Sequence, residues 1–131
     1  MSLVSEILER EISVKMQQIA IDLDGRIVNR TPVKTGRLRS NWVIGLGSPN
    51  RGVIQDYSDE TGLLSESEAA QLGLRVAEEH AVAINRALQM EDIYISNNLP
   101  YALPIEEGGP TTTARAMVAT SILETRREFQ L

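Results

Sequence analysis

The chain has 131 residues, no cysteine, few aromatic residues and a formal net charge of −5. This length fits a single domain, residues 1–131, that can bury a core without disulfides, and the lack of cysteine excludes thiolate chemistry. The acidic balance argues against a protein that wraps duplex DNA, and no apolar run approaches the ~18 residues that a membrane span needs. We therefore expect a soluble, intracellular domain with a core of Ile, Leu, Val and Ala.

The first predicted element is a long helix from about residue 3 to residue 30. Pro32 biases the residue before it away from helical conformation and so predicts where the helix ends. Arg26 and Arg30 suit the negative end of the helix dipole. Apolar residues recur every three or four positions, which is typical of one face of a helix: Val4, Leu8, Ile12, Met16, Ile19, Leu23 and Ile27.

A basic turn, residues 31–42, follows this helix. Residues 25–55 hold six basic and no acidic residues, whereas the remainder of the chain has a formal charge of −11. Pro32 prevents a helix from running through the turn, and Gly36 permits backbone conformations that other residues avoid. We predict a strand over residues 37–47, in which side chains alternate between two faces. Leu38 and Trp42 would then be buried, and Arg37 and Arg39 would form a pair that faces solvent.

The remaining elements suggest a small sheet covered by helices. Val53–Tyr57 could form a hairpin with the first strand, and residues 91–96 alternate like a further strand. A helix from Ser65 to about residue 89 opens with the Ser65–Glu68 pattern of a capping box. Residues 99–109 look irregular, and residues 111–129 form a last helix. The order predicts an α+β fold, with a long N-terminal helix and two further helices packed on a small antiparallel sheet.

Catalytic groups are few. His80 is the only histidine, and its acidic neighbours on a helix favour a solvated surface position. A metal site would need further ligands, and the chain has no cysteine or second histidine. Glu106 and Glu107 could act as a general acid and base, as in a hydrolase, but adjacent carboxylates before two glycines are more typical of an exposed loop. We therefore assign no catalytic, metal-binding or cofactor-binding residue.

Two segments resemble one protein family. Residues 31–42, TPVKTGRLRSNW, resemble the "aPvdTGrLr" signature of the tail-completion and head–tail joining proteins of long-tailed bacteriophages. Residues 93–109, IYISNNLPYALPIEEGG, are similar to the family's later pattern, a strand and then "YA…vEfGg". The closing helix, with Met117 near its start, also fits. Two positions depart from the pattern: Lys34 stands where an acid is usual, and Glu107 where an aromatic is usual.

This resemblance implies a virion protein of the phage neck, assembled in the host cytoplasm and without catalysis or cofactor. It implies a hexameric ring that touches head-connector and tail-terminator or tail-tube proteins, with DNA only as passing cargo and no membrane. A positive turn and a negative loop are candidates for the contact between subunits or with a neighbouring ring. The interface set is Lys34, Arg37, Arg39, Tyr101, Glu106 and Glu107, and the structural set is Pro32, Gly36, Leu38, Trp42 and Gly108. The alternative is a small nucleic-acid-binding or regulatory module that uses Lys34–Arg39.

Overall fold

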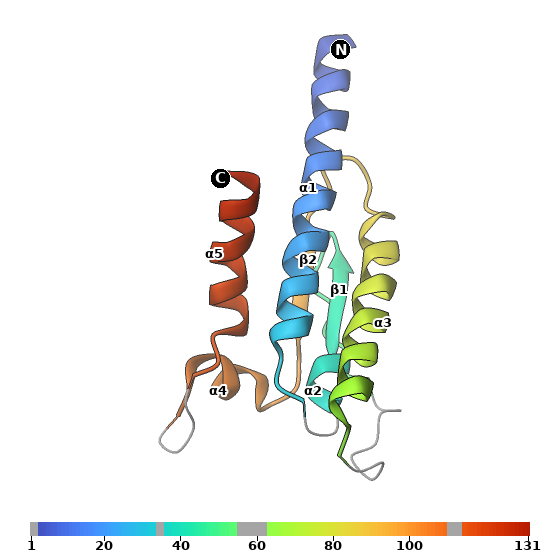
Figure 1. Cartoon of the computed structure of the whole chain (residues 1–131). Coiled ribbons are helices and arrows are strands. Elements are labelled where there is room, and N and C mark those ends of the chain that lie inside the picture. Colours follow the sequence, from blue (N-terminus) through green and yellow to red (C-terminus); the bar gives the residue numbers. More distant parts are fainter. Residues whose placement is uncertain (1–2, 34–35, 55–62, 110–113) are drawn as a thin grey trace.

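A computed structural model describes residues 3–33, 36–54, 63–109 and 114–131 of the chain. The fold is α+β, as predicted, with helices and a two-stranded antiparallel sheet (Figure 1). Helices α3 and α5 lie on either side of the C-terminal half of α1, whose N-terminal half projects beyond them. The elements are α1 (Leu3–Arg30), α2 (Arg37–Ser40), β1 (Trp42–Leu46), α3 (Glu66–Ile84), β2 (Ile93–Asn97), α4 (Ala102–Glu107) and α5 (Met117–Phe129).

Helix α1 has the predicted bounds, but most of the residues that it buries do not belong to the predicted apolar period. Its buried residues are Ser13, Ala20, Asp24, Ile27 and Val28, of which only Ile27 belongs to the period. At about 100° per residue, Leu8 lies about 160° around the helix axis from Asp24. The first three apolar positions of the period, at residues 4, 8 and 12, are consequently exposed.

The sheet pairs β1 with β2, and the predicted hairpin is wrong in the part that the structure describes. Residues 53 and 54 are not in a strand, and residues 55–57 lie outside the described residues. In the observed register Trp42 is opposite Asn97 and Leu46 is opposite Ile93. The loop after β1 folds back onto the strand: a Cβ on Gly45 would lie 2.3 Å from the Ser48 carbonyl oxygen. A glycine is needed at position 45 because of this close backbone approach, and the returning loop takes the place of a hairpin strand.

The other helices begin and end for local reasons. The predicted capping box of α3 is confirmed, because the Glu68 N–H donates to Ser65 Oγ and the Ser65 N–H donates to Glu68 Oε1. Helix α3 ends at Ile84 rather than near residue 89. Helix α5 begins at Met117 rather than residue 111, after Ala116 in left-handed conformation. Part of the segment predicted as irregular forms α4.

A single buried apolar cluster joins most of these elements. Leu38 and Trp42 are both members, so their predicted burial is confirmed. None of the helices in the described ranges is long and apolar enough to cross a membrane. The cluster consists of Ile27, Val28, Leu38, Trp42, Leu72, Val76, Leu99, Ala102 and Met117.

Candidate docking surface

The two arginines of the basic turn have different environments. Residues 37–40 form one helical turn, α2, rather than the start of a strand, so alternation does not apply to them. Gly36 precedes this turn with φ 91°, a left-handed conformation that favours glycine. Arg37 is half-buried, whereas Arg39 is only 8% exposed. The predicted solvent-facing pair of Arg37 and Arg39 is therefore wrong for Arg39.

Arg39 ties the end of α1 to the start of α3. Its Nη1 donates to the Ala69 carbonyl at 2.6 Å, and its Nη2 donates to the carbonyls of Asn29 at 3.1 Å and Thr31 at 2.8 Å. The last carbonyls of a helix lack partners within the helix and carry its negative dipole end, so a cation suits this position. Burial lowers the pKa of the Arg39 guanidinium. Gly73 makes room for this contact, because a Cβ there would lie 3.2 Å from Arg39 Nη1.

The aromatic anchor of the turn is held by the same end of α1. Trp42 Nε1 donates to Thr31 Oγ1 at 2.8 Å, and Thr31 Oγ1 donates to the Ile27 carbonyl at 2.7 Å. Both Trp42 and Thr31 are buried, so the indole N–H is satisfied inside the core. Pro32 follows directly after Thr31 and is half-buried, and Lys34 lies outside the described residues.

The second segment of the resemblance forms α4 and its flanks. Tyr101 and Glu107 are exposed. Glu106 instead caps α5, since its carboxylate accepts the N–H groups of Val118 at 2.8 Å and Ala119 at 3.0 Å. Gly108 ends α4 with φ 84° and donates its N–H to the Pro104 carbonyl at 2.7 Å. The prediction of an exposed acidic pair thus holds for Glu107 but not for Glu106, which is partly buried and has a structural role.

The structure brings the two segments together. Asn97 Nδ2 donates to the Leu38 carbonyl at 2.9 Å, and Asn97 is also the register partner of Trp42. Leu99 and Ala102 join Leu38 and Trp42 in the same core cluster. Helices α2 and α4 lie at the end of the fold that is opposite the N-terminus (Figure 1). Of the predicted interface residues, Tyr101 and Glu107 are exposed, and Arg37 and Glu106 are half-buried; Leu103 of α4 is also exposed.

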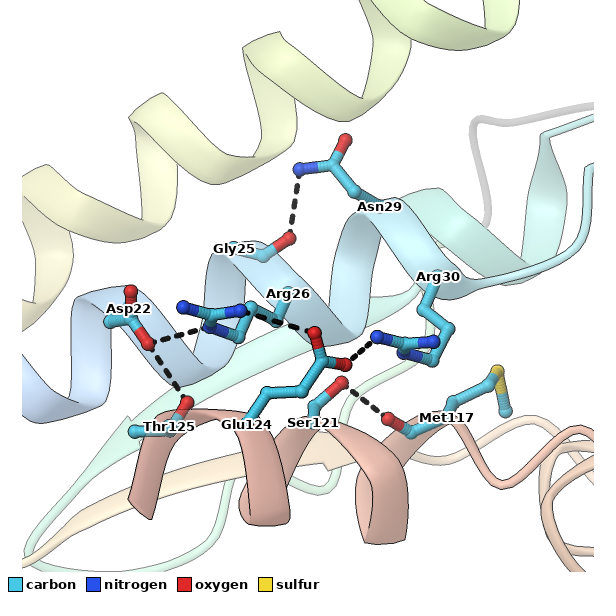
Figure 2. A network of polar contacts seen from close by, with 9 residues as sticks. All are labelled: Asp22, Gly25, Arg26, Asn29, Arg30, Met117, Ser121, Glu124 and Thr125. Carbon is cyan, nitrogen blue, oxygen red and sulfur yellow. Dashed lines mark hydrogen bonds and ion pairs between the residues drawn. The ribbon is translucent and has the colours of Figure 1, made fainter. Parts of the chain in front are cut away.

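A polar network that the sequence analysis did not predict joins α1 to α5 (Figure 2). Arg26 Nε donates to Asp22 Oδ2 at 2.8 Å, and Arg26 Nη1 donates to Glu124 Oε2 at 3.2 Å. Arg30 forms an ion pair with Glu124, and Thr125 Oγ1 donates to Asp22 Oδ2 at 2.9 Å. The sequence signal was present, since charged residues at positions 22, 26 and 30 recur every four residues along α1. Both arginines had been interpreted only through the helix dipole.

His80 is not a solvated surface residue, contrary to the prediction. Its side chain is 12% exposed, and its Nδ1 lies 2.9 Å and 3.0 Å from the two carboxyl oxygens of Asp24 across the α1–α3 contact. Asp24 is only 1% exposed. Burial raises the pKa of the Asp24 carboxyl, and the hydrogen bond and charge of His80 act in the opposite direction. Asp24 and His80 lie on different helices and far apart in the sequence, so the residues next to His80 do not reveal this contact.

Within the described residues, no group of three or more His, Cys, Asp or Glu side chains could hold a metal ion. Comparisons of the chain with protein-family models, with curated proteins and with solved structures found no match. Helices α2 and α4 thus form a partly charged surface, which is supported by hydrogen bonds of Arg39 and Glu106 within the chain.

Proposed function

We propose that this chain is a structural protein of the neck of a long-tailed bacteriophage. In this role it forms a hexameric ring that completes the tail and joins it to the DNA-filled head, without catalysis and without a cofactor. The observation that carries the proposal is the contact between the two segments that resemble the family. Asn97 bonds to the Leu38 backbone, and residues of both segments share one core. Two short patterns far apart in the sequence thus form one structural unit.

The proposed contact surface is smaller than the set expected from the sequence. Tyr101 and Glu107 are exposed and Arg37 is half-buried, whereas the contacts of Arg39 and Glu106 with backbone groups support this surface. A ring needs a heterologous interface, in which one patch meets a different patch on the next subunit. A cation on α2 and a carboxylate at the end of α4 suit such a contact, or a contact with a neighbouring head-connector, tail-terminator or tail-tube protein.

Disruption of the coding sequence in a phage that carries it tests this role. Filled heads and complete tails should then accumulate without joining, and electron microscopy of the lysate would show them apart. Infectious particles at the normal titre would contradict the proposal.

Arg37→Glu tests the surface itself. Because Arg37 is half-buried and has no place in the core cluster, the variant should keep its circular dichroism spectrum and lose the ability to restore joining. Leu74→Glu on the exposed face of α3 is the matched control and should restore joining. If Arg37→Glu restores joining fully, Arg37 is not part of the proposed interface. The result of the gene disruption would still test the proposed role.

The nucleic-acid alternative has less support. Arg39 is only 8% exposed and donates to three backbone carbonyls, so its guanidinium is not available to phosphates. The indole of Trp42 is 5% exposed and cannot serve as a platform on which bases stack.

A further inference from the structure

The N-terminal half of α1 projects from the fold with its apolar side uncovered (Figure 1). Leu8 is 51% exposed and Ile12 is 48% exposed. Polar contacts anchor the C-terminal end of this segment: Met90 N–H donates to Ser13 Oγ at 2.8 Å, and Gln17 Nε2 donates to the Ala87 carbonyl at 3.3 Å. Residues 3–12 are all exposed, so the apolar side chains of this segment face solvent. The exposed apolar residues of this half are Leu3, Val4, Ile7, Leu8, Ile12 and Val14.

An apolar groove continues this stripe along the packed half of α1. The groove has a volume of about 530 Å³ and lies between α1 and β2. Met16, Ile19 and Leu23 continue the spacing of Leu8 and Ile12, so the stripe and the groove form one continuous face. The lining residues are Met16, Ile19, Ala20, Leu23, Asp92, Ile93, Tyr94 and Ile95.

The accessible surface area of the chain is larger than that of a compact monomer of the same mass. Its accessible area is 8438 Å². A compact monomer of 14.5 kDa should expose only about 6900 Å². The excess is roughly twice the about 800 Å² that each partner buries in a stable interface of standard size. The projecting half of α1 contributes to this excess, because residues 3–12 are all exposed.

We propose that two copies of this chain pair in solution through α1, with the two helices antiparallel about a two-fold axis. One register fits the stripe: Val4 lies opposite Leu23 and Leu8 opposite Ile19, and Ile12 lies within one residue of the position opposite Met16. In this register the projecting half of each copy lies in the groove of the other copy, and both grooves are filled.

A parallel pairing is less favourable for two reasons. In a parallel pair with the two helices in register, the projecting halves of the two copies would contact each other, and both grooves would stay empty. With the helices staggered, only one projecting half and one groove would be covered in each pair. The antiparallel arrangement also sets the two helix dipoles in opposite directions. The contact is isologous, because the same face serves on both copies.

This dimer is independent of the proposed function, because it is a state of the free protein before any assembly. An isologous pair closes on itself and does not build a ring. Its failure would leave the neck role unaffected, and unjoined heads and tails would say nothing about the dimer.

Mass measurement by light scattering is the first test, on purified full-length protein at several tens of micromolar. The wild type should have twice the 14.5 kDa mass of the chain. Leu8→Glu should give the mass of one chain with an unchanged circular dichroism spectrum, because the Leu8 side chain is half-exposed in the monomer. Leu74→Glu, which places the same charge at an equally exposed leucine on α3, should remain dimeric. A monomeric wild type, or a dimeric Leu8→Glu, would overturn the proposal.

Cross-linking tests the register, because the chain has no cysteine of its own. The double variant Leu8→Cys, Ile19→Cys should form a disulfide-linked dimer on oxidation and no larger species. Leu8→Cys alone should not cross-link, since its two copies lie about 16 Å apart along the helices in this register. A disulfide requires Cα atoms within about 7 Å. A ladder of larger species would mean head-to-tail contact and would overturn the two-fold pairing, as would the absence of any cross-link.

Discussion

The two halves of α1 differ in what covers them, although one apolar period runs through both. In the C-terminal half, α3 contacts the side that carries the buried Asp24, and α5 contacts a side that carries Asp22 and Arg26. In the N-terminal half the apolar residues of the period face solvent. Within one chain, therefore, the packed half of the helix is no more apolar in composition than the projecting half.

This difference shows that an apolar period in the sequence identifies one face of a helix, but it does not identify which element packs against that face. Polar and charged residues of α1 are buried where a specific partner satisfies them, as His80 does for Asp24 and Thr125 does for Asp22. Apolar residues are exposed where this fold offers no element long enough to reach them. We infer that the packed half of α1 determines the stability of the monomer and that the projecting half determines its association.

The largest expected contrast is between Ile27→Ala and Leu8→Ala. Ile27 is 2% exposed in the core cluster, so its truncation should lower the free energy of unfolding by about 2–5 kcal/mol. Leu8→Ala should change the unfolding of the monomer by less than about 0.5 kcal/mol, because a half-exposed side chain outside the core leaves no cavity. Urea denaturation at low protein concentration measures both values.

Protein concentration separates the two effects further. If α1 pairs between copies, Leu8→Ala should reduce the concentration dependence of the denaturation midpoint, whereas Ile27→Ala should retain it. Equal losses of monomer stability in the two variants would show that the projecting half packs on its own chain, and the comparison would fail.

The second contrast tests how the end of the packed half is held. Arg39→Met keeps much of the side-chain volume but leaves three carbonyls, including those of Asn29 and Thr31, without their charged donor. We expect a loss of about 2–4 kcal/mol in the free energy of unfolding, by the cost of buried acceptors without partners. Arg37→Met, two residues away and half-buried, should lose less than about 1 kcal/mol. Similar losses would mean that Arg39 acts only through its charge and not through these contacts.

Local chemistry made much of the fold predictable. The bounds of α1 and the capping box at Ser65 and Glu68 both follow from rules that act within a few residues. The strand at residues 93–97 was also expected at nearly its observed place. In each case neighbouring residues suffice to fix the outcome.

The candidate site was harder to predict, because its side chains are positioned by contacts that span long stretches of sequence. Arg39 is buried because α3 offers the Ala69 carbonyl, and Gly73 leaves space for the guanidinium. Glu106 caps a helix that begins eleven residues later. Residues 37–40 could alternate as a strand or coil as a single turn, and Gly36 together with the carbonyls at the end of α1 favours the turn. A sequence pattern contains none of these distances.

The smallest effect concerns Asp24, the buried carboxyl of the packed half. Burial raises the pKa of Asp24 in the folded state above its ordinary value of 3.8, so the folded protein binds this proton more tightly than the unfolded chain does. The resulting stabilisation is complete below about pH 3.8 and is lost as the pH rises through the raised pKa. It amounts to about 1.4 kcal/mol for each unit by which the pKa is raised.

Asp24→Asn isolates this effect, because the amide keeps an acceptor for His80 and has no proton to lose. The free energy of unfolding of the wild type, minus that of Asp24→Asn, should decrease as the pH rises from about 4, measured by urea denaturation across the pH range. A difference that increases with pH would mean that the charge of His80 outweighs the burial of Asp24. The packed half of α1 would then hold a true ion pair between Asp24 and His80. The contrast between the halves would be sharper, because the packed half would bury charge while the projecting half exposes leucine.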